Sequence, residues 1–252
     1  MNPFPAPRVP PVGTPTSPSR RDCLVCAAAT LLAPTGLWAA PAPRQLQWDY
    51  EIKGKASGFS YQARASWVWQ REANRYTLTQ QLSVPLLGSQ TQTSQGIWRD
   101  PQGPEPRQFT DSKRTERNVA FEPEQGQLRF LNGSARAPWA PGAQDRLSLF
   151  LALMQHSQSL KAPTPGQRWT CPVASSRGLD AWHFECLGSA SLALPAGQFT
   201  AWAWERTQLP AGESTLQVWL SPQAGWGPVR VLITEPSGNQ ADQRLSQFKT
   251  NA

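Results

Sequence analysis

The segment PGAQDRLSLFLALMQHS, Pro141–Ser157, differs from the rest of the chain because its apolar residues have helical spacing. They form one wide face: Leu147, Leu149, Phe150, Leu151, Leu153 and Met154. A Pro-Gly pair precedes the face, and Asp145 suits the positive N-terminal end of a helix. Burying each large side chain contributes roughly 1.5–3 kcal/mol. We therefore expect a helix at about residues 144–157 that covers another element.

From Gln45 onward the sequence instead alternates with the period of two that is typical of half-buried strands. One face of the first run contains Leu46, Trp48, Tyr50 and Ile52, and one face of the second contains Tyr61, Ala63, Ala65, Trp67 and Trp69. A third run, Tyr76, Leu78, Leu82 and Val84, is interrupted by Gln80. This pattern predicts a mainly β fold over residues 45–249, a single curved antiparallel sheet or partly closed barrel with the helix as its cover. Two subdomains divided by the helix are the alternative.

Composition agrees with many short elements joined by turns. Only 16% of the 252 residues are charged, and there are 25 prolines and 12 tryptophans. No apolar run reaches the roughly 18 residues that a membrane-spanning helix needs.

The N-terminal residues have the pattern of an export signal. A proline-rich stretch, Met1–Pro18, precedes Arg20 and Arg21, and a modestly apolar run, Cys23–Leu37, leads to small residues. The paired arginines are similar to a twin-arginine signal. The alternative, a membrane anchor, is disfavoured because the run is short and broken by a proline. We predict that residues 1–39 are a proline-rich extension and a cleaved signal, and that the protein is periplasmic.

Two cysteines, Cys171 and Cys186, then remain in neighbouring strand-like segments. Exported proteins commonly pair such cysteines, and closing a loop of about 15 residues would contribute roughly 3 kcal/mol. We predict a disulfide, with two free buried thiols as the alternative.

Catalytic chemistry has little support. A Ser-His-Asp site would have to use His156 or His183. Asp145 and Ser148 share the predicted helix with His156, but Asp145 and His156 would lie roughly 16 Å apart along its axis. No G-x-S-x-G motif occurs. We predict no catalytic residues.

A metal or cofactor site has no better support. His183 and Glu185 would share one strand face while Cys186 points to the other. No phosphate-binding glycine loop or cofactor fingerprint occurs. We predict neither metal nor cofactor.

The basic run KRTER, Lys113–Arg117, and the net charge of +7 raise the question of an anionic partner. The simplest interpretation of this run is a solvated strand face. Export argues against nucleic acid as a partner. If the run is functional, we expect it to bind acidic head groups, including those of an anionic membrane surface in peripheral contact with the protein.

Four segments resemble the domain of unknown function 3108 family and occur in its order: SQTQTSQGIW, PRQFTDSKRTERNVAFE, GAQDRLSLFLAL and VWLSPQAGWGPVRVLITEPSGNQADQRL. The resemblance covers residues 45–248, and its best marker is Gln144-Asp145 before the apolar helix. The chain departs from the family pattern at Gly227, where a leucine is expected before Pro228. The resemblance implies an exported envelope protein with a β-rich fold, and it supplies no catalytic residues.

A curved sheet covered by an apolar helix could enclose an acyl chain or a similar hydrophobic molecule. The residues expected to line such a site are Trp48, Trp67, Trp69, Phe150 and Met154. The alternatives are that they simply fill a core and the protein is a scaffold for other proteins, or that it is a hydrolase acting on envelope material. The sequence does not indicate an oligomeric state.

Overall fold

The computed structural model describes residues 45–251 apart from 86–87, 132–134 and 176–177, so the predicted export signal lies outside the described residues. These residues belong to one compact unit, Pro41–Ala252. The strands are β1 (Gln45–Ala56), β2 (Phe59–Glu72), β3 (Arg75–Val84), β4 (Gly88–Arg99), β5 (Gly103–Asp111), β6 (Val119–Glu122), β7 (Gln127–Phe130), β8 (Arg136–Pro138), β9 (Arg168–Ala174), β10 (Leu179–Leu194), β11 (Gly197–Thr207), β12 (Thr215–Leu220), β13 (Pro228–Thr234) and β14 (Gln240–Asn251). The helices are α1 (Ser148–Leu160) and the 3-10 turns η1 (Thr115–Arg117), η2 (Pro123–Gln125) and η3 (Pro222–Ala224).

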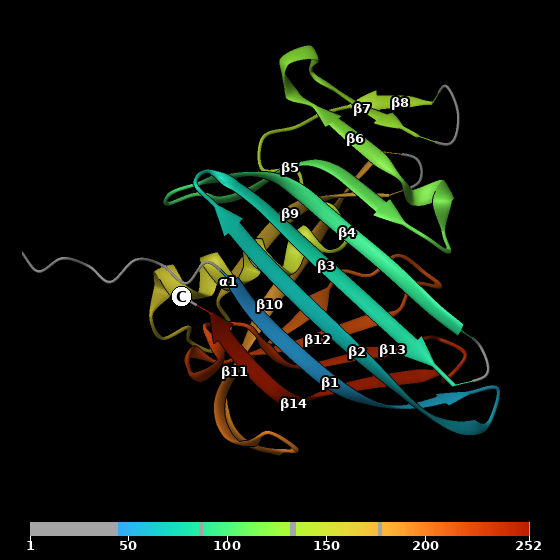
Figure 1. Cartoon of the computed structure of the whole chain (residues 1–252), viewed down its shortest axis with the longest axis vertical. Coiled ribbons are helices and arrows are strands. Elements are labelled where there is room, and N and C mark those ends of the chain that lie inside the picture. Colours follow the sequence, from blue (N-terminus) through green and yellow to red (C-terminus); the bar gives the residue numbers. More distant parts are fainter. Residues whose placement is uncertain (1–44, 86–87, 132–134, 176–177, 252) are drawn as a thin grey trace, which may run out of the picture. The chain divides into compact units, whose positions relative to one another are not determined.

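All 14 strands form one antiparallel sheet, in the order β8-β7-β6-β5-β4-β3-β2-β1-β14-β13-β12-β11-β10-β9. The first and last strands, β1 and β14, pair in the middle, and each half of the chain then meanders outward by hairpins. The sheet is not closed, because β8 and β9 are its two edges. Figure 1 shows the two halves curving toward each other with α1 on the concave side. The predicted fold class is therefore confirmed.

Alternation along the central strands follows the prediction. In β1, the buried residues are Leu46, Trp48, Tyr50 and Ile52, and in β2 they are Ala63, Ala65, Trp67 and Trp69. The register pairs Tyr50 with Ala65 and Ile52 with Ala63, so large and small side chains are neighbours on this part of the inner face. The core therefore lies between the concave sheet and α1.

The helix begins and ends later than predicted. Gln144 is extended, because it forms a parallel bridge with Val173 of β9, and the first helical residue is Ser148. The helix continues to Leu160 and ends where Lys161 has a positive φ of 62°. Among the described residues, no helix is both long enough and apolar enough to cross a bilayer.

Gln144 connects the two halves of the sheet across its opening. Its backbone N–H donates to Pro172 O at 2.8 Å, and its carbonyl accepts from Ala174 N at 2.7 Å, both in β9. Its side-chain Nε2 donates to Pro104 O of β5 at 2.9 Å. This part of β5 needs such a donor because β6 pairs only with Gln108 and Phe109. A single residue thus links β5 and β9 just before the helix begins.

Candidate functional site

A cavity of about 570 Å³ opens at one end of the curved sheet, where Ile52 of β1, Val84 of β3 and Ile233 of β13 line it. Its volume lies within the range of about 300–1,000 Å³ that is usual for small-molecule sites. The apolar part of its wall consists of Ile52, Trp67, Leu82, Val84, Leu149, Phe150, Leu216, Val231 and Ile233. The concave face is therefore hollow at this end.

Strand β3 shows the hollow directly. Its inner side chains Tyr76 and Leu78 are 2% and 0% exposed, whereas Leu82 and Val84, further along the same face, are only half-buried. The alternation is unchanged along the strand, so the difference arises from what lies opposite. At the Tyr76 end the space is filled, and at the Val84 end the cavity begins.

Polar side chains share the inner wall with these apolar residues. The register aligns Trp67, Gln80 and Gln92 across β2, β3 and β4, and all three line the cavity. Gln243 of β14, which pairs with Ile52 of β1, also lines the cavity. The buried atoms Trp67 Nε1 and Gln243 Oε1 have no hydrogen-bond partner among the described residues. Buried polar groups are normally paired, so these two are exceptions in the wall.

Four arginines line the same cavity: Arg114, Arg117, Arg146 and Arg206. We call them the arginine cluster. They come from the loop before η1, from η1 itself, from the approach to α1 and from β11. The acidic residues in the wall are Glu213 and Glu235. The cavity wall therefore carries an excess of positive charge.

Arg206 is the most buried member of the cluster, with 5% exposure. Its Nη2 lies 2.5 Å from Glu213 Oε2, and its guanidinium carbon lies 3.7 Å from the ring centroid of Trp182. Arg146 stands 5.5 Å from the same ring. The Nε atoms of both arginines are buried and have no hydrogen-bond partner in the described part of the chain. Both guanidinium groups thus contact the ring of Trp182.

Burial and neighbouring positive charges both disfavour the protonated form of two of these arginines. Burial lowers the pKa of Arg146, and the nearby guanidinium of Arg117 lowers it further. Burial, followed by the charge of Arg114, likewise lowers the pKa of Arg117. An anion between the arginines would relieve the repulsion.

The residues predicted to line a ligand site are divided between the cavity and the packed core. Trp67 and Phe150 lie in the cavity wall, with their ring centroids 4.8 Å apart. Trp48 donates its indole N–H to Ala224 O at 3.1 Å, and Trp69 packs on Trp98 with centroids 5.3 Å apart. Met154 is buried in α1. These last three are not among the residues that line the cavity.

Asp145 has a structural position at the start of α1. Its Oδ1 accepts from Leu147 N at 2.8 Å and Ser148 N at 2.7 Å, and its Oδ2 accepts from Ser94 Oγ at 2.6 Å. The Ser94 hydroxyl has only one proton, so the Tyr76 hydroxyl donates to Ser94 at 3.0 Å. Burial raises the pKa of Asp145 despite these bonds. The carboxylate caps the helix and joins it to β3 and β4.

The two histidines lie apart from this carboxylate. His156 stacks on Trp169 with centroids 5.5 Å apart, and burial lowers its pKa. His183 contacts Thr170 Oγ1 through Nδ1 at 3.0 Å, and its neighbour Glu185 pairs with Arg168. Within the described part of the chain, no group of three His, Cys, Asp or Glu residues is placed to hold a metal ion.

The predicted Cys171–Cys186 disulfide is wrong for this structure, in which both residues are free buried thiols. The antiparallel register places Trp182, not Cys186, opposite Cys171. Cys186 lies four residues further along β10, roughly 13 Å away at about 3.3 Å per residue. Bonded cysteines need Cα atoms within about 7 Å. Burial raises the pKa of the Cys171 thiol to about 12, which also makes it a poor nucleophile.

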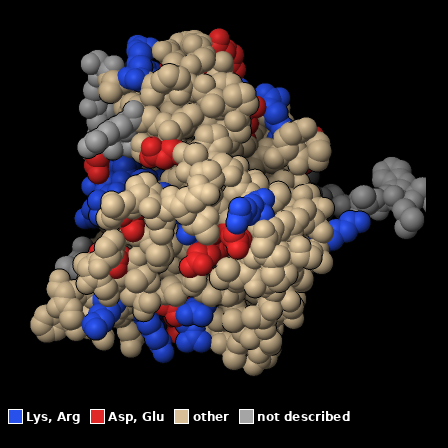
Figure 2. Space-filling view, turned by 180° about the vertical axis from the view of Figure 1, so that it is seen from behind, with Lys and Arg blue, Asp and Glu red and all other residues tan. Residues whose placement is uncertain are grey.

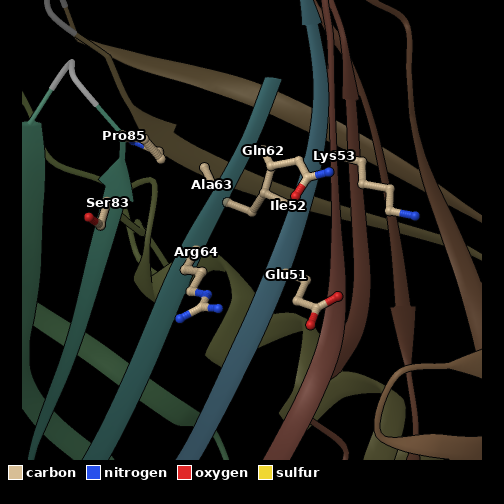
Figure 3. A pocket seen from close by; sticks show the side chains of 8 residues that line it. All are labelled: Glu51, Ile52, Lys53, Gln62, Ala63, Arg64, Ser83 and Pro85. Carbon is tan, nitrogen blue, oxygen red and sulfur yellow. The ribbon is translucent and has the colours of Figure 1, made fainter. Parts of the chain in front are cut away.

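A second hollow, of about 460 Å³, lies over β1, β2 and the end of β3 (Figure 3). Its exposed side chains are of mixed charge: acidic Glu51 and basic Lys53 on β1, and neutral Gln62 and basic Arg64 on β2. Figure 2 shows a similar mixture of both signs on the face seen from behind. The arginine cluster differs from these surfaces because its charge is mainly of one sign and partly buried.

Sequence reasoning missed most of the arginine cluster. The run Lys113–Arg117 is predicted as a solvated strand face. In the structure its last three residues instead form the 3-10 turn η1. Two signals were present in the sequence. Gln80 interrupts an apolar row, and Arg206 follows Trp204 on the inner face of β11. A polar residue at an inward strand position indicates either a buried partner or a hollow.

Among solved structures, one match with a TM-score above 0.5 supports the fold, and two further matches have lower scores. A beta-barrel-like protein of the DUF1849 domain of unknown function from Brucella abortus matches 84% of this chain and 100% of its own, with 9% identity and a TM-score of 0.54. MucB matches 83% of this chain and 54% of its own, with 10% identity and a TM-score of 0.33. A domain from Vibrio parahaemolyticus named for outer membrane lipoprotein sorting matches 82% and 85%, with 9% identity and a TM-score of 0.29.

In sequence, no curated protein matches the chain. A family model described as "Protein of unknown function (DUF3108)" matches residues 49–245, which include most of the sheet, α1 and every residue of the cavity wall. The resemblance noted from the four sequence segments is thereby confirmed. The chain belongs to the DUF3108 family of proteins of unknown function.

Proposed function

We propose that the protein is a non-enzymatic envelope protein that binds a hydrophobic ligand, such as an acyl chain, in the cavity at the open end of its sheet. The observation that carries this proposal is the hollow between sheet and helix. Leu82 and Val84 of β3 and Ile233 of β13 line it and remain half-buried. In a solid core these side chains would be covered, because interiors are packed to nearly crystalline density.

The cavity favours ligand binding over the two alternatives. A scaffold for other proteins needs no hollow, and its core would be filled. A hydrolase needs a nucleophile, a base and a carboxylate that converge. His183 lies near Thr170, while Asp145 is occupied at the start of α1.

Binding can be tested with fatty acids and indole fluorescence, because Trp67 lies in the cavity wall. We expect saturable quenching by a long-chain fatty acid. Ala241, also in the wall, provides the variant: Ala241→Trp should fill the cavity and abolish quenching. Ala190→Trp is the matched control, since Ala190 is exposed on β10. Equal binding by both variants would place the ligand elsewhere and refute the proposal.

Export is the second part of the proposal, supported by the arginine pair and apolar run near the N-terminus. Cell fractionation tests it. We expect the protein in the periplasmic fraction, and we expect Arg20→Lys combined with Arg21→Lys to leave it in the cytoplasm if the twin-arginine route is used. Recovery of the unaltered protein only from the cytoplasm would end this part of the proposal.

A further inference from the structure

We propose that the ligand is an acidic amphiphile whose carboxylate or phosphate head group is bound by the arginine cluster while its tail occupies the apolar part of the cavity. This inference rests on the proposed function and specifies the chemical class of the ligand. It follows from the charges, the unpaired donors and the arrangement of the cavity wall.

The first observation is the charge imbalance. Four arginines line the cavity, against Glu213 and Glu235. Arg206 pairs with Glu213, whereas Arg117 and Arg146 form no ion pair with any described residue. Half-buried Arg230, outside the cavity, has a carboxylate partner in Asp242 at 2.8 Å. The cavity therefore holds guanidinium groups that lack an anion.

The second observation is that the site is built into the fold. Arg206 is 5% exposed and is held between Glu213 and the ring of Trp182. Its Nε and that of Arg146 are buried and have no hydrogen-bond partner among the described residues. A guanidinium group presents donors in a planar fork that matches carboxylate and phosphate oxygens. An acidic head group in the cavity would pair with the guanidinium charges that line it.

The third observation is that the charged and apolar parts belong to one cavity. Arg146 directly precedes α1, and Leu149 and Phe150 in the first turn of α1 continue the wall. Leu216 and Ile233 form the wall from β12 and β13. A molecule bound there would contact cations at one end and hydrocarbon surface along its length. A free fatty acid and a lysophospholipid with an acidic head group share this chemistry.

Three probes with the same 16-carbon tail separate the contributions: palmitate, 1-palmitoyl lysophosphatidate and the neutral hexadecanol. We expect the native protein to bind at least one acidic probe about tenfold or more tightly than hexadecanol, as charge-assisted hydrogen bonds provide. Preference for palmitate would indicate a free acid as the ligand, and preference for lysophosphatidate would indicate a phospholipid head group.

The variant Arg117→Gln combined with Arg146→Gln tests the cluster without altering the buried Arg206. We expect its affinity for the acidic probes to fall to within about twofold of its affinity for hexadecanol, whose own binding should stay unchanged. Retained hexadecanol binding shows that the cavity is folded. Arg136→Gln is the matched control, because Arg136 is an exposed residue of β8.

The outcomes separate this inference from the proposed function. If the native protein binds hexadecanol as tightly as both acidic probes, the ligand is not acidic and the inference is wrong, while the proposed function stands. If the double variant keeps the acidic preference, the head group lies elsewhere and the inference is also wrong. If no probe binds at all, both proposals fail.

Discussion

Gly227 lies against the indole ring of Trp48, and replacing it tests how tightly the filled end of the sheet is packed. A Cβ atom on Gly227 would lie 2.1 Å from Trp48 Nε1 and 2.3 Å from Cε2, where 3.4–4 Å is ordinary contact. Its φ is outside the left-handed region, so a substitution adds steric contact without backbone strain.

Trp48 cannot move aside easily. It is 0% exposed, its indole N–H donates to Ala224 O at 3.1 Å, and its ring stacks on Phe248 at 6.0 Å. Overpacking costs about 1–3 kcal/mol, and a buried donor that loses its acceptor costs a similar amount. We therefore expect Gly227→Ala to lower the free energy of unfolding by about 2–5 kcal/mol, and Gly227→Leu by more.

Urea denaturation followed by circular dichroism measures this change. Trp48→Ala alone should cost about 3–5 kcal/mol through the space it leaves. Gly227→Leu in the Trp48→Ala background should recover about 2 kcal/mol or more, because the leucine then fills that space.

Gly178→Ala is the control, since its Cβ would meet Ala137 Cβ at an ordinary 3.7 Å. A cost below about 1 kcal/mol for Gly227→Ala, or additive effects in the double variant, would refute the reasoning.

Four further predictions concern the buried groups and the cavity. The folded protein holds the proton of Asp145 more tightly than the unfolded chain, since burial raises its pKa. The free energy of unfolding should therefore fall as pH rises above the ordinary value of 3.8, and Asp145→Asn should remove this contribution in urea titrations between about pH 4 and about pH 7; an unchanged pH profile would contradict it. Asp145→Ala, which leaves two backbone N–H groups uncapped, should cost about 2–4 kcal/mol in the same assay, and a cost near zero would show that the cap is dispensable. Alkylation of the unfolded protein without reductant should label both Cys171 and Cys186, whereas a disulfide-linked peptide pair in mass spectra would show that the register of β9 and β10 is wrong. In the cavity, each additional methylene of a fatty acid should tighten binding by up to about fourfold, from about 0.8 kcal/mol of burial, until the tail fills the space; affinity independent of tail length would exclude an enclosed tail.

The individual strands and the helix could be predicted from the sequence because the spacing of apolar residues within each element is a local property. Alternation in β1 and β2 is a property of a single strand, so Trp48 and Trp67 are recognisable as inward residues before their partners are known. The apolar face of α1 is equally local, although its start depends on the bridge from Gln144 to β9 and was placed too early.

The site could not be predicted because it depends on which residues meet across the fold. Arg117, Arg146 and Arg206 are brought together only because the sheet curves and α1 crosses its opening. Strand register likewise decides that Cys171 faces Trp182 and not Cys186.

The amino-acid sequence by itself determined which side chains point inward, since that depends only on the period of two along each strand. Tertiary structure alone decided which of these inward side chains are covered. Tyr76 and Val84 share one face of β3, yet only the first is fully buried. The physical reason is that close packing requires volume from both walls, and the wall opposite Val84 leaves that volume open.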